Sequence, residues 1–317
     1  MTDAVRPMVL VAGSANLDFV VRAAHVPAPG ETVLGRDFST FPGGKGANQA
    51  VACARAGGAQ TQMLLALGQD EAARPIEASL RDAGVVLHVM RDAALPTGTA
   101  FICLSDSAEN AITVAPGANM ALRGEHLPAL DGIGWLLLQL ETPMASVLAH
   151  ARAARAAGVK VALNAAPARA LSGELLSLLD VLIVNEGELQ VVADNPPDLA
   201  TGLARLPVPC VIVTLGARGS LARMAGQIRV QPAFGVEPLD TTAAGDTFCG
   251  VLVAAFAHGA SVVEALRQAS AASALACTRL GAQSSIPTLA EVEALLSDTS
   301  RTPDADAHAA LAAWCAP

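Results

Sequence analysis

The sequence contains no tyrosine, and aromatic residues make up only 3% of its 317 positions. We therefore expect any bound ligand to be packed by aliphatic walls rather than between aromatic rings. Hydrophobic residues make up 52% of the chain, but no uninterrupted apolar run is long enough to span a bilayer. The first residues also lack the basic, apolar and small-residue succession of a signal peptide. These absences predict a soluble cytoplasmic protein without a membrane partner.

Clusters of cysteine and of basic residues are missing as well. The 6 cysteines are scattered without a C-x-x-C pair, so reduced core thiols are expected rather than disulfides or a thiolate metal site. The net charge of −9, without a Lys/Arg cluster, argues against a nucleic-acid partner. A magnesium nucleotide can still bind such a protein, because backbone amides, single cations and the metal hold its phosphates locally.

Strand-like and helix-like segments alternate along much of the chain. The length allows one large α/β domain or two small ones. Strands are expected at 61–68, 85–90, 135–140, 159–164 and 181–184, helices at 71–83, 143–157, 173–179, 262–278 and 289–296, and an antiparallel ribbon at 220–224 and 227–230. The alternation is typical of a largely parallel sheet with helices on both faces. Ligands of such sheets gather at the carboxyl ends of the strands.

Two loop-rich excursions interrupt this pattern, at 25–42 and 97–114. The first contains short strand-like segments, including 31–34, and the second reads as a hairpin with its turn at 106–109. Together they are expected to form a small sheet that serves as a lid over the α/β body. The C-terminal tail has no assignment, although Trp314 indicates that it docks rather than trails freely.

The first apolar segment, 9–21, reads as a buried strand interrupted by small and polar residues at 13–16. Asn16 and Asp18 lie two residues apart, so in extended backbone their side chains point to the same side. Such a pair could form hydrogen bonds to two neighbouring hydroxyl groups of a ligand. A turn in which both side chains bond to their own backbone is the alternative.

A glycine-rich turn at 41–50 opens into an alanine-rich helix that ends near 57–58. Its spacing is that of neither a Walker A loop nor a strand-bound G-x-G-x-x-G fingerprint. The glycines nevertheless allow a close approach of the backbone to a ligand, while Lys45 and Asn48 offer donors near a helix start. A flexible turn with an exposed lysine is the alternative.

The stretch 240–250 combines a turn, a helix start and a carboxylate. Small residues at Ala243, Ala244 and Gly245 allow backbone N–H groups to converge, and the positive end of the following helix suits an anion. Asp246 lies in the first helical turn, where it could accept a proton from a hydroxyl group. An Asp-capped core helix is the alternative.

Asn185 and Glu188 stand three apart across another helix start, so their side chains can face the same side. Their oxygens could orient magnesium through its water ligands, since Mg²⁺ usually keeps much of its hydration shell. Asn at the N-cap with Glu three residues later is equally a variant of the capping box.

The glycine-rich turn at 41–50 and the stretch 240–250 strongly resemble the two signatures of the ribokinase family of PfkB-type carbohydrate kinases. They occur in the expected order and separation, and the resemblance runs from about residue 9 to residue 296. Shorter similar segments are 13–18, 138–143, 164–169, 184–186 and 214–219. So many ordered matches identify the chain as a member of the family.

The resemblance implies a single ribokinase-like domain at 1–297, a three-layer α/β/α fold with a mostly parallel central sheet. A small β-sheet lid would be formed by segments at about 18–42 and 97–115. The tail at 298–317 has no counterpart in the family. Lid sheets of this family often pair between subunits, so a homodimer through the lid sheet is expected.

The resemblance also implies a role for each candidate residue. Sugar hydroxyls would be held by Asn16, Asp18, Gly44, Lys45, Asn48 and Glu141. Asp246 would be the catalytic base, beside an anion hole formed by the amides of Ala243, Ala244 and Gly245. Nucleotide and magnesium would be bound by Asn185, Glu188 (through water), Thr214, Gly216, Gly219, Gly245 and Ser270. A potassium ion, or another monovalent cation, would be bound mostly through backbone carbonyls at Asp240, Thr242, Ala276, Gly281 and Ser285.

The implied reaction is transfer of the γ-phosphoryl group of magnesium ATP to O5 of D-ribose. Asp246 would accept the hydroxyl proton while the oxygen attacks phosphorus in line, and the helix-start amides would stabilise the transferring group. Another acceptor, such as deoxyribose, a ketose or a nucleoside, stays open, because sugar choice depends on hydrogen bonds to single hydroxyls. A sugar-binding pseudokinase without turnover is the alternative from a different class.

Overall fold

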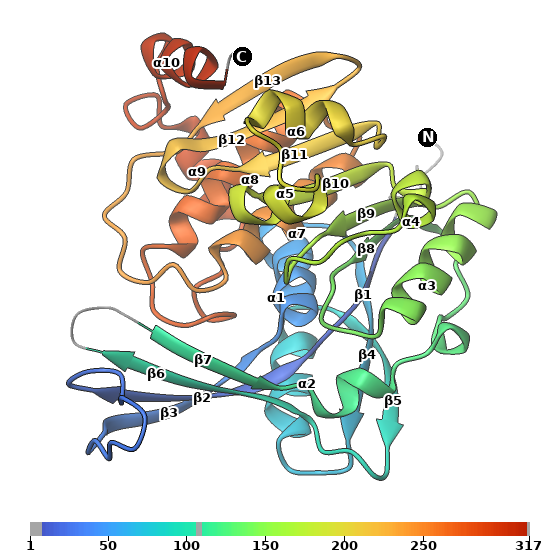
Figure 1. Ribbon diagram of the computed structural model, residues 1–317, viewed down its shortest axis with the longest axis vertical. Helices are drawn as coiled ribbons and strands as arrows, with labels where there is room; N and C mark the ends of the chain where they lie inside the picture. Colours follow the sequence, from blue (N-terminus) through green and yellow to red (C-terminus); the bar gives the residue numbers. More distant parts are fainter. Residues whose placement is uncertain (1–7, 106–109, 316–317) are drawn as a thin grey trace.

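Two β-sheets organise the residues that the computed structural model describes, 8–105 and 110–315 (Figure 1). The strands of the larger sheet are β1 (Met8–Ala12), β4 (Thr61–Gly68), β5 (Val86–Asp92), β8 (Ile133–Leu138), β9 (Lys160–Asn164), β10 (Val181–Asn185), β11 (Cys210–Thr214), β12 (Gly219–Met224) and β13 (Gln227–Pro232). Their order across the sheet is β13-β12-β11-β10-β9-β8-β1-β4-β5. Neighbours from β11 to β5 pair in parallel, whereas β12 and β13 run antiparallel. The predicted, mostly parallel sheet is confirmed.

Helices cover both faces of this sheet. One face carries α1 (Lys45–Val51), α2 (Ala73–Asp82), α7 (Ala244–Ala257), α8 (Val262–Ala276) and α9 (Leu289–Ser297), and the other carries α3 (Met144–Ala156), α4 (Gly173–Leu178), α5 (Glu186–Val192), α6 (Leu199–Arg205) and α10 (Ala305–Cys315). In β1, Val9 and Val11 enter the first core and Leu10 enters the second, because successive side chains of a strand point to opposite faces. The predicted three layers are confirmed, although helix α6 was not predicted from the sequence.

The smaller sheet corrects the prediction for the first apolar segment. Its strands are β2 (Asn16–Ala23), β3 (Arg36–Gly43), β6 (Gly98–Ser105) and β7 (Asn110–Ala115), in the order β3-β2-β6-β7. Residues 9–21 are therefore not one interrupted strand, because the chain leaves the larger sheet after β1 and enters the smaller sheet at β2. Figure 1 shows the smaller sheet at the end of the molecule opposite to α10.

Within the first excursion, the predicted strand at 31–34 is absent from the described structure, and that segment is a loop. It follows two prolines and Gly30, whose φ of 83° turns the chain before pairing with β2 begins at Arg36. The turn predicted at 106–109 lies outside the described residues. The small separate sheet itself is confirmed, although one of its strands, β2, comes from the first apolar segment and not from either excursion.

Helix α7 crosses α1 at very close range, and this crossing places the site. A Cβ atom added at Gly250 of α7 would lie 2.5 Å from the carbonyl oxygen of Gln49 and 2.6 Å from Cβ of Ala52. Only glycine allows this approach. The first turn of α7 therefore faces the side chains of α1.

The C-terminal tail contains α10, which packs on β13 and buries Leu311 and Cys315. The ring of Trp314 lies 4.3 Å from the guanidinium carbon of Arg218, in the short 3₁₀ helix η4 (Gly216–Arg218). No helix among residues 8–105 and 110–315 combines the length and the hydropathy that a membrane crossing needs.

Candidate active site

Asp246 stands at the centre of a buried network of amide side chains. It lies in the first turn of α7 and is only 9% exposed. Its Oδ2 accepts a hydrogen bond from Nδ2 of Asn48, and its Oδ1 accepts one from Nε2 of Gln49, both at 2.9 Å. The two donors come from adjacent residues of α1, so one helix fixes both oxygens of the carboxylate.

The sugar-side candidates gather next to Asp246. Asn16 and Asp18 stand at the start of β2 and are 3% and 8% exposed. Burial, together with the negative charges of Glu141 and Asp246, raises the pKa of Asp18 to about 7. The structure therefore brings together three carboxyl groups that are far apart in the sequence.

Lys45 and Glu141 complete this group. The negative charge of Asp246 raises the pKa of Lys45, and it outweighs the partial burial of the amine, which acts in the opposite direction. Oε2 of Glu141 accepts hydrogen bonds from the hydroxyl of Ser14 at 2.6 Å and from the backbone N–H of Lys45 at 3.2 Å. Gly44, the remaining sugar-side candidate, is the N-cap of α1.

The predicted anion hole lies where α7 begins. Ala243 is its N-cap and adopts a left-handed conformation with φ of 59°, which costs a non-glycine residue about 1 kcal/mol. The amide of Ala244 donates to the carbonyl oxygen of Thr241 at 3.2 Å, so an incoming phosphoryl group would compete for this donor. The positive end of the α7 dipole adds to the attraction for an anion.

Asn185 and Glu188 form the capping box that the sequence left open as an alternative. Oδ1 of Asn185 accepts from the amide of Glu188, and Oε2 of Glu188 accepts from the amide of Asn185, both at 2.8 Å. The capping interaction does not remove these residues from the site, because both line a cavity together with Lys45 and Asp246. Partial burial raises the pKa of Glu188, and a nearby cation would offset the cost of keeping this carboxylate charged.

Two neighbouring cavities open beside the start of α7. The smaller has a volume of about 240 Å³ and contains the Asp246 end of the site, whereas the larger has a volume of about 430 Å³. Thr214, Thr241 and Gly245 line both cavities. The larger cavity is also lined by the predicted nucleotide residues Gly216, Gly219 and Ser270. The predicted nucleotide positions therefore lie on one continuous surface with Asp246.

The predicted monovalent-cation residues lie on two loops that Asp240 joins. Its Oδ1 accepts from the amide of Thr242 and its Oδ2 from the amide of Gly281, both at 2.9 Å. Ala276 ends α8 just before the second loop, and Ser285 is fully buried, with its hydroxyl bonded to the carbonyl oxygen of Ala282 at 2.8 Å. The Asp240 carboxylate therefore holds the two loops together through backbone amides, and its negative charge lies between them.

Three residues of the site, Gln49, Gln139 and Asn119, had no predicted role in the sequence. Gln49 holds Asp246 and also donates to Oδ1 of Asn164 at 3.0 Å, while Gln139 donates to Oε1 of Gln49 at 2.6 Å. Asn119 donates to Oδ1 of Asn16 at 2.8 Å and accepts from the amide of Ala15 at 3.0 Å. These residues could have been noticed in the sequence only as polar amides within apolar or small-residue segments, as at Gln49 in the 41–50 motif. The residues that they bond to could not be predicted from sequence spacing.

A buried carboxylate fixed at a helix start, next to a cavity lined by the predicted nucleotide residues, fits a phosphotransferase that acts on a hydroxyl group. Comparison with known proteins agrees. A model of the pfkB family of carbohydrate kinases matches residues 6–289. The chain belongs to this family and is an ATP-dependent sugar kinase.

Within the family, the chain is similar to ribokinases in particular. It is 40% identical to the ribokinase of Haemophilus influenzae over 299 residues, which cover 90% of this chain and 97% of that protein. The solved ribokinase of Thermotoga maritima has 35% identity and a TM-score of 0.85, and the match covers 92% of this chain and 100% of that one. The ribokinase of Arabidopsis thaliana, solved with ribose and ATP, has 33% identity and a TM-score of 0.85, with 92% and 99% covered.

Proposed function

We propose that this kinase transfers the γ-phosphoryl group of ATP to O5 of D-ribose and produces D-ribose 5-phosphate. The similar proteins named as ribokinases support ribose as the acceptor. The observation that carries the proposal is the placement of Asp246, whose carboxylate is fixed by two amide donors at a helix start. A group held in this way is oriented for one proton transfer.

Asp246 acts as the general base in this mechanism. The primary hydroxyl of the sugar donates its proton to the carboxylate as its oxygen attacks the γ-phosphorus in line. General base catalysis of this kind contributes about 10² to 10⁴ in rate. Because Asn48 and Gln49 fix both oxygens, the carboxylate need not reorient before it accepts the proton.

The other carboxyl and amide side chains hold the sugar. Asn16 and Asp18 face the same side of β2 and receive neighbouring hydroxyls, and Lys45, Asn48 and Glu141 contact the rest of the ring. The backbone of Gly44 approaches the sugar closely. The smaller sheet covers this group as a lid and limits access of water to ATP.

Stabilisation of the transferring phosphoryl group falls to the start of α7. The amides of Ala243, Ala244 and Gly245 and the helix dipole offer positive charge there, and each such donor commonly contributes a few kcal/mol. The amide of Ala244 exchanges its contact with Thr241 for the phosphoryl oxygen. The nucleotide lies along Thr214, Gly216, Gly219 and Ser270 in the larger cavity.

Two cations complete the proposed site. Magnesium that arrives with ATP neutralises phosphate charge, and Glu188 beside Asn185 would hold it through water. Potassium, or another monovalent cation, would be bound beside the anion hole by Asp240 and the carbonyls of Thr242, Ala276 and Gly281, with Ser285 nearby. A cytoplasmic location and a homodimer through the lid sheet remain predictions.

An ATP-coupled assay over a panel of sugars and nucleosides tests the proposal. We expect the highest kcat/KM with D-ribose, and an increase in activity when potassium replaces a bulky organic cation. If deoxyribose, a ketose or a nucleoside gives a higher kcat/KM than ribose, that compound is the substrate and the ribose assignment is wrong. Sugar binding without ATP consumption by any member of the panel would instead support a pseudokinase.

A further inference from the structure

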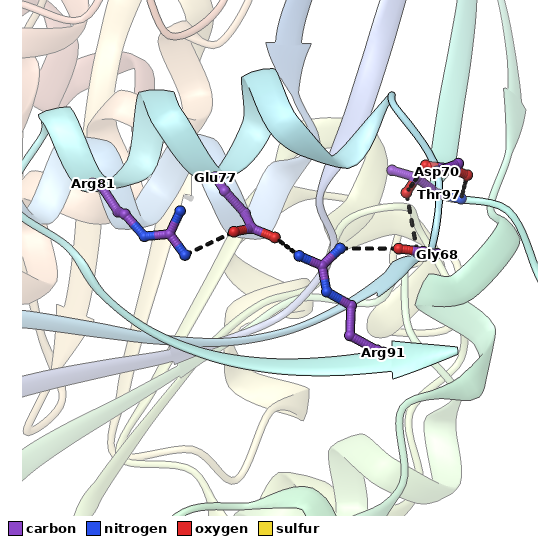
Figure 2. Close-up of polar contacts among 6 residues, drawn as sticks. All are labelled: Gly68, Asp70, Glu77, Arg81, Arg91 and Thr97. Atoms are coloured by element: carbon purple, nitrogen blue, oxygen red, sulfur yellow. Dashed lines mark hydrogen bonds and ion pairs between the residues drawn. The ribbon is translucent and has the colours of Figure 1, made fainter. Parts of the chain in front are cut away.

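The smaller sheet is tied to the body of the molecule at Thr97, the residue that precedes β6 (Figure 2). Thr97 is only 1% exposed. Its amide donates to Oδ2 of Asp70 at 2.7 Å, and its hydroxyl donates to Oδ1 of Asp70 at 2.6 Å. The same hydroxyl accepts from the amide of Gly68, the last residue of β4, at 3.0 Å. We call this arrangement of Gly68, Asp70 and Thr97 the lid-root clasp.

The body side of the clasp is itself held firmly. Arg91 of β5 donates to the carbonyl oxygen of Gly68 at 2.9 Å and also pairs with Glu77 of α2. Glu77 is 8% exposed and pairs with Arg81 at 2.7 Å, so its buried charge is compensated by two arginines. Figure 2 shows this chain of contacts from Arg81 to Gly68. Both polar groups of the Gly68 backbone are thus engaged.

The strand leaving the clasp leads directly to the sugar side. Gly98 follows Thr97 and pairs with Asn16 in the parallel register of β2 and β6. A Cβ atom at Gly98 would lie 2.3 Å from Oδ1 of Asn16 and 2.3 Å from Nδ2 of Asn119. Any shift of the strand at Thr97 therefore moves Gly98 against the side chain that the proposed mechanism uses to hold a sugar hydroxyl.

The returning strand is tied at the same place. After β7 the chain enters η2 (Gly117–Ala121), where the amide of Ala118 donates to the carbonyl oxygen of Pro96 at 2.7 Å. Asn119 of this helix bonds to Asn16. Because the β6–β7 hairpin leaves and re-enters the body beside the clasp, its orientation over the site depends on Thr97.

We propose that Asp70 and Thr97 are positioning residues for the sugar, which fix the root of the lid so that Gly98 and Asn16 keep their register. The proposal rests on the proposed function of the Asn16 side as the sugar site. Neither residue touches the substrate. Loss of the clasp weakens sugar binding and leaves nucleotide binding unchanged, because the nucleotide cavities lie at α7, β11 and β12.

A threonine-to-valine exchange separates this role from a general effect on folding. Thr97→Val removes the hydroxyl at nearly constant shape and leaves the Gly68 amide without its acceptor, whereas Thr97→Ser keeps the hydroxyl. Thr61→Val is the matched control, because Thr61 is also a buried threonine, stands at the opposite end of β4, and bonds to the carbonyl oxygen of Ala59 at 3.0 Å.

We expect Thr97→Val to raise the KM and the calorimetric Kd for the sugar about tenfold, because sugar binding must then order the lid root without this charge-assisted hydrogen bond. The KM for ATP should change less than twofold. Thr97→Ser should restore sugar binding to within about twofold of the native value. Asp70→Asn should raise the sugar Kd by a similar factor. The variant that carries both Thr97→Val and Asp70→Asn should have a sugar Kd no higher than the higher of the two single-variant values, because both exchanges break the same contact.

An unchanged sugar Kd in Thr97→Val, or equal losses for sugar and ATP, would overturn the proposal. So would the same sugar defect in Thr61→Val, which would show a general loss of packing. Failure of the proposed function is recognised separately, because the native enzyme would then have a higher kcat/KM with an acceptor other than ribose. The same comparison of variants is then made with that acceptor, using the calorimetric Kd.

Discussion

Nε2 of Gln49 lies 2.9 Å from Oδ1 of Asp246 and 3.0 Å from Oδ1 of Asn164. One amide group therefore connects the start of α7 to the carboxyl end of β9. Gln139 has no hydrogen bond to Asp246, but its Nε2 donates to Oε1 of Gln49 and so fixes the Gln49 side chain. The proposed catalytic base is thus oriented by a side chain that is itself completely buried.

Replacement of Asp246 tests its role as the base. Asp246→Asn keeps the size of the side chain but cannot accept the hydroxyl proton, so kcat should fall by about 10² to 10⁴. The calorimetric Kd for the sugar should change little. Near-normal turnover would show that another group accepts the proton.

Replacement of Gln49 tests whether orientation of the carboxylate matters. Gln49→Met keeps the length of the side chain but removes the donor to Asp246, and we expect kcat to fall about tenfold or more while the KM for ATP stays within about twofold. Gln139→Met is the matched control, because it disturbs the same buried network without removing a contact to Asp246. It should lower the free energy of unfolding by about 1 to 3 kcal/mol and keep most of the turnover. Equal losses of kcat in both variants would contradict a specific role of Gln49.

Asp18 should make the stability of the sugar-free enzyme depend on pH. Its pKa is raised from 3.8 to about 7 in the folded chain, so between these values the folded state binds more protons than the unfolded state. The stability due to this proton is full below about pH 4 and is lost as pH rises through 7. Asp18→Asn should therefore be more stable than the native enzyme at pH 8, on the order of 2 to 4 kcal/mol.

Urea unfolding at pH 4 and pH 8 measures this difference. The advantage of Asp18→Asn should shrink toward zero at the lower pH, where the native side chain is protonated in the folded state and close to half-protonated in the unfolded state. An advantage of the same size at both values would mean that packing, rather than ionisation, separates the two proteins.

The C-terminal helix should support the nucleotide side. Trp314 stacks on Arg218, whose ion pair with Glu186 at 2.5 Å connects η4 to the start of α5. Trp314→Ala should raise the KM for ATP about two- to fivefold, since an exposed cation–π contact contributes about 0.5 to 1 kcal/mol. The sugar KM should stay constant.

Two exchanges on the same helix serve as references for Trp314→Ala. Leu311→Ala removes a buried side chain and should lower the free energy of unfolding by about 2 to 5 kcal/mol with little effect on the ATP KM. Asp306→Ala, on the exposed first turn, should change neither quantity. If Trp314→Ala leaves the ATP KM unchanged and only lowers the free energy of unfolding, as Leu311→Ala does, the tail stabilises the fold without acting on the nucleotide loop.

The sequence by itself indicated the layers of the fold, and its resemblance to a known family implied the chemistry proposed for the site. The alternation of apolar strands and helices indicates a largely parallel sheet with helices on both faces, because each strand is apolar on both sides and each helix has a face to bury. The motifs at 41–50 and 240–250 also contained the carboxylate, the small residues and the amides of the proposed site. These properties depend on local spacing, which a sequence displays directly.

Only the tertiary structure decided which distant residues meet. The switch between sheets at 13–15, the contact of Gln49 with Asp246, and the joining of Asp70 to Thr97 all depend on how elements cross in space. The raised pKa of Asp18 arises in the same way, because burial and two other carboxylates act on it only after folding. Burial and charge interactions depend on distance through space rather than along the chain, so spacing in the sequence could not reveal them.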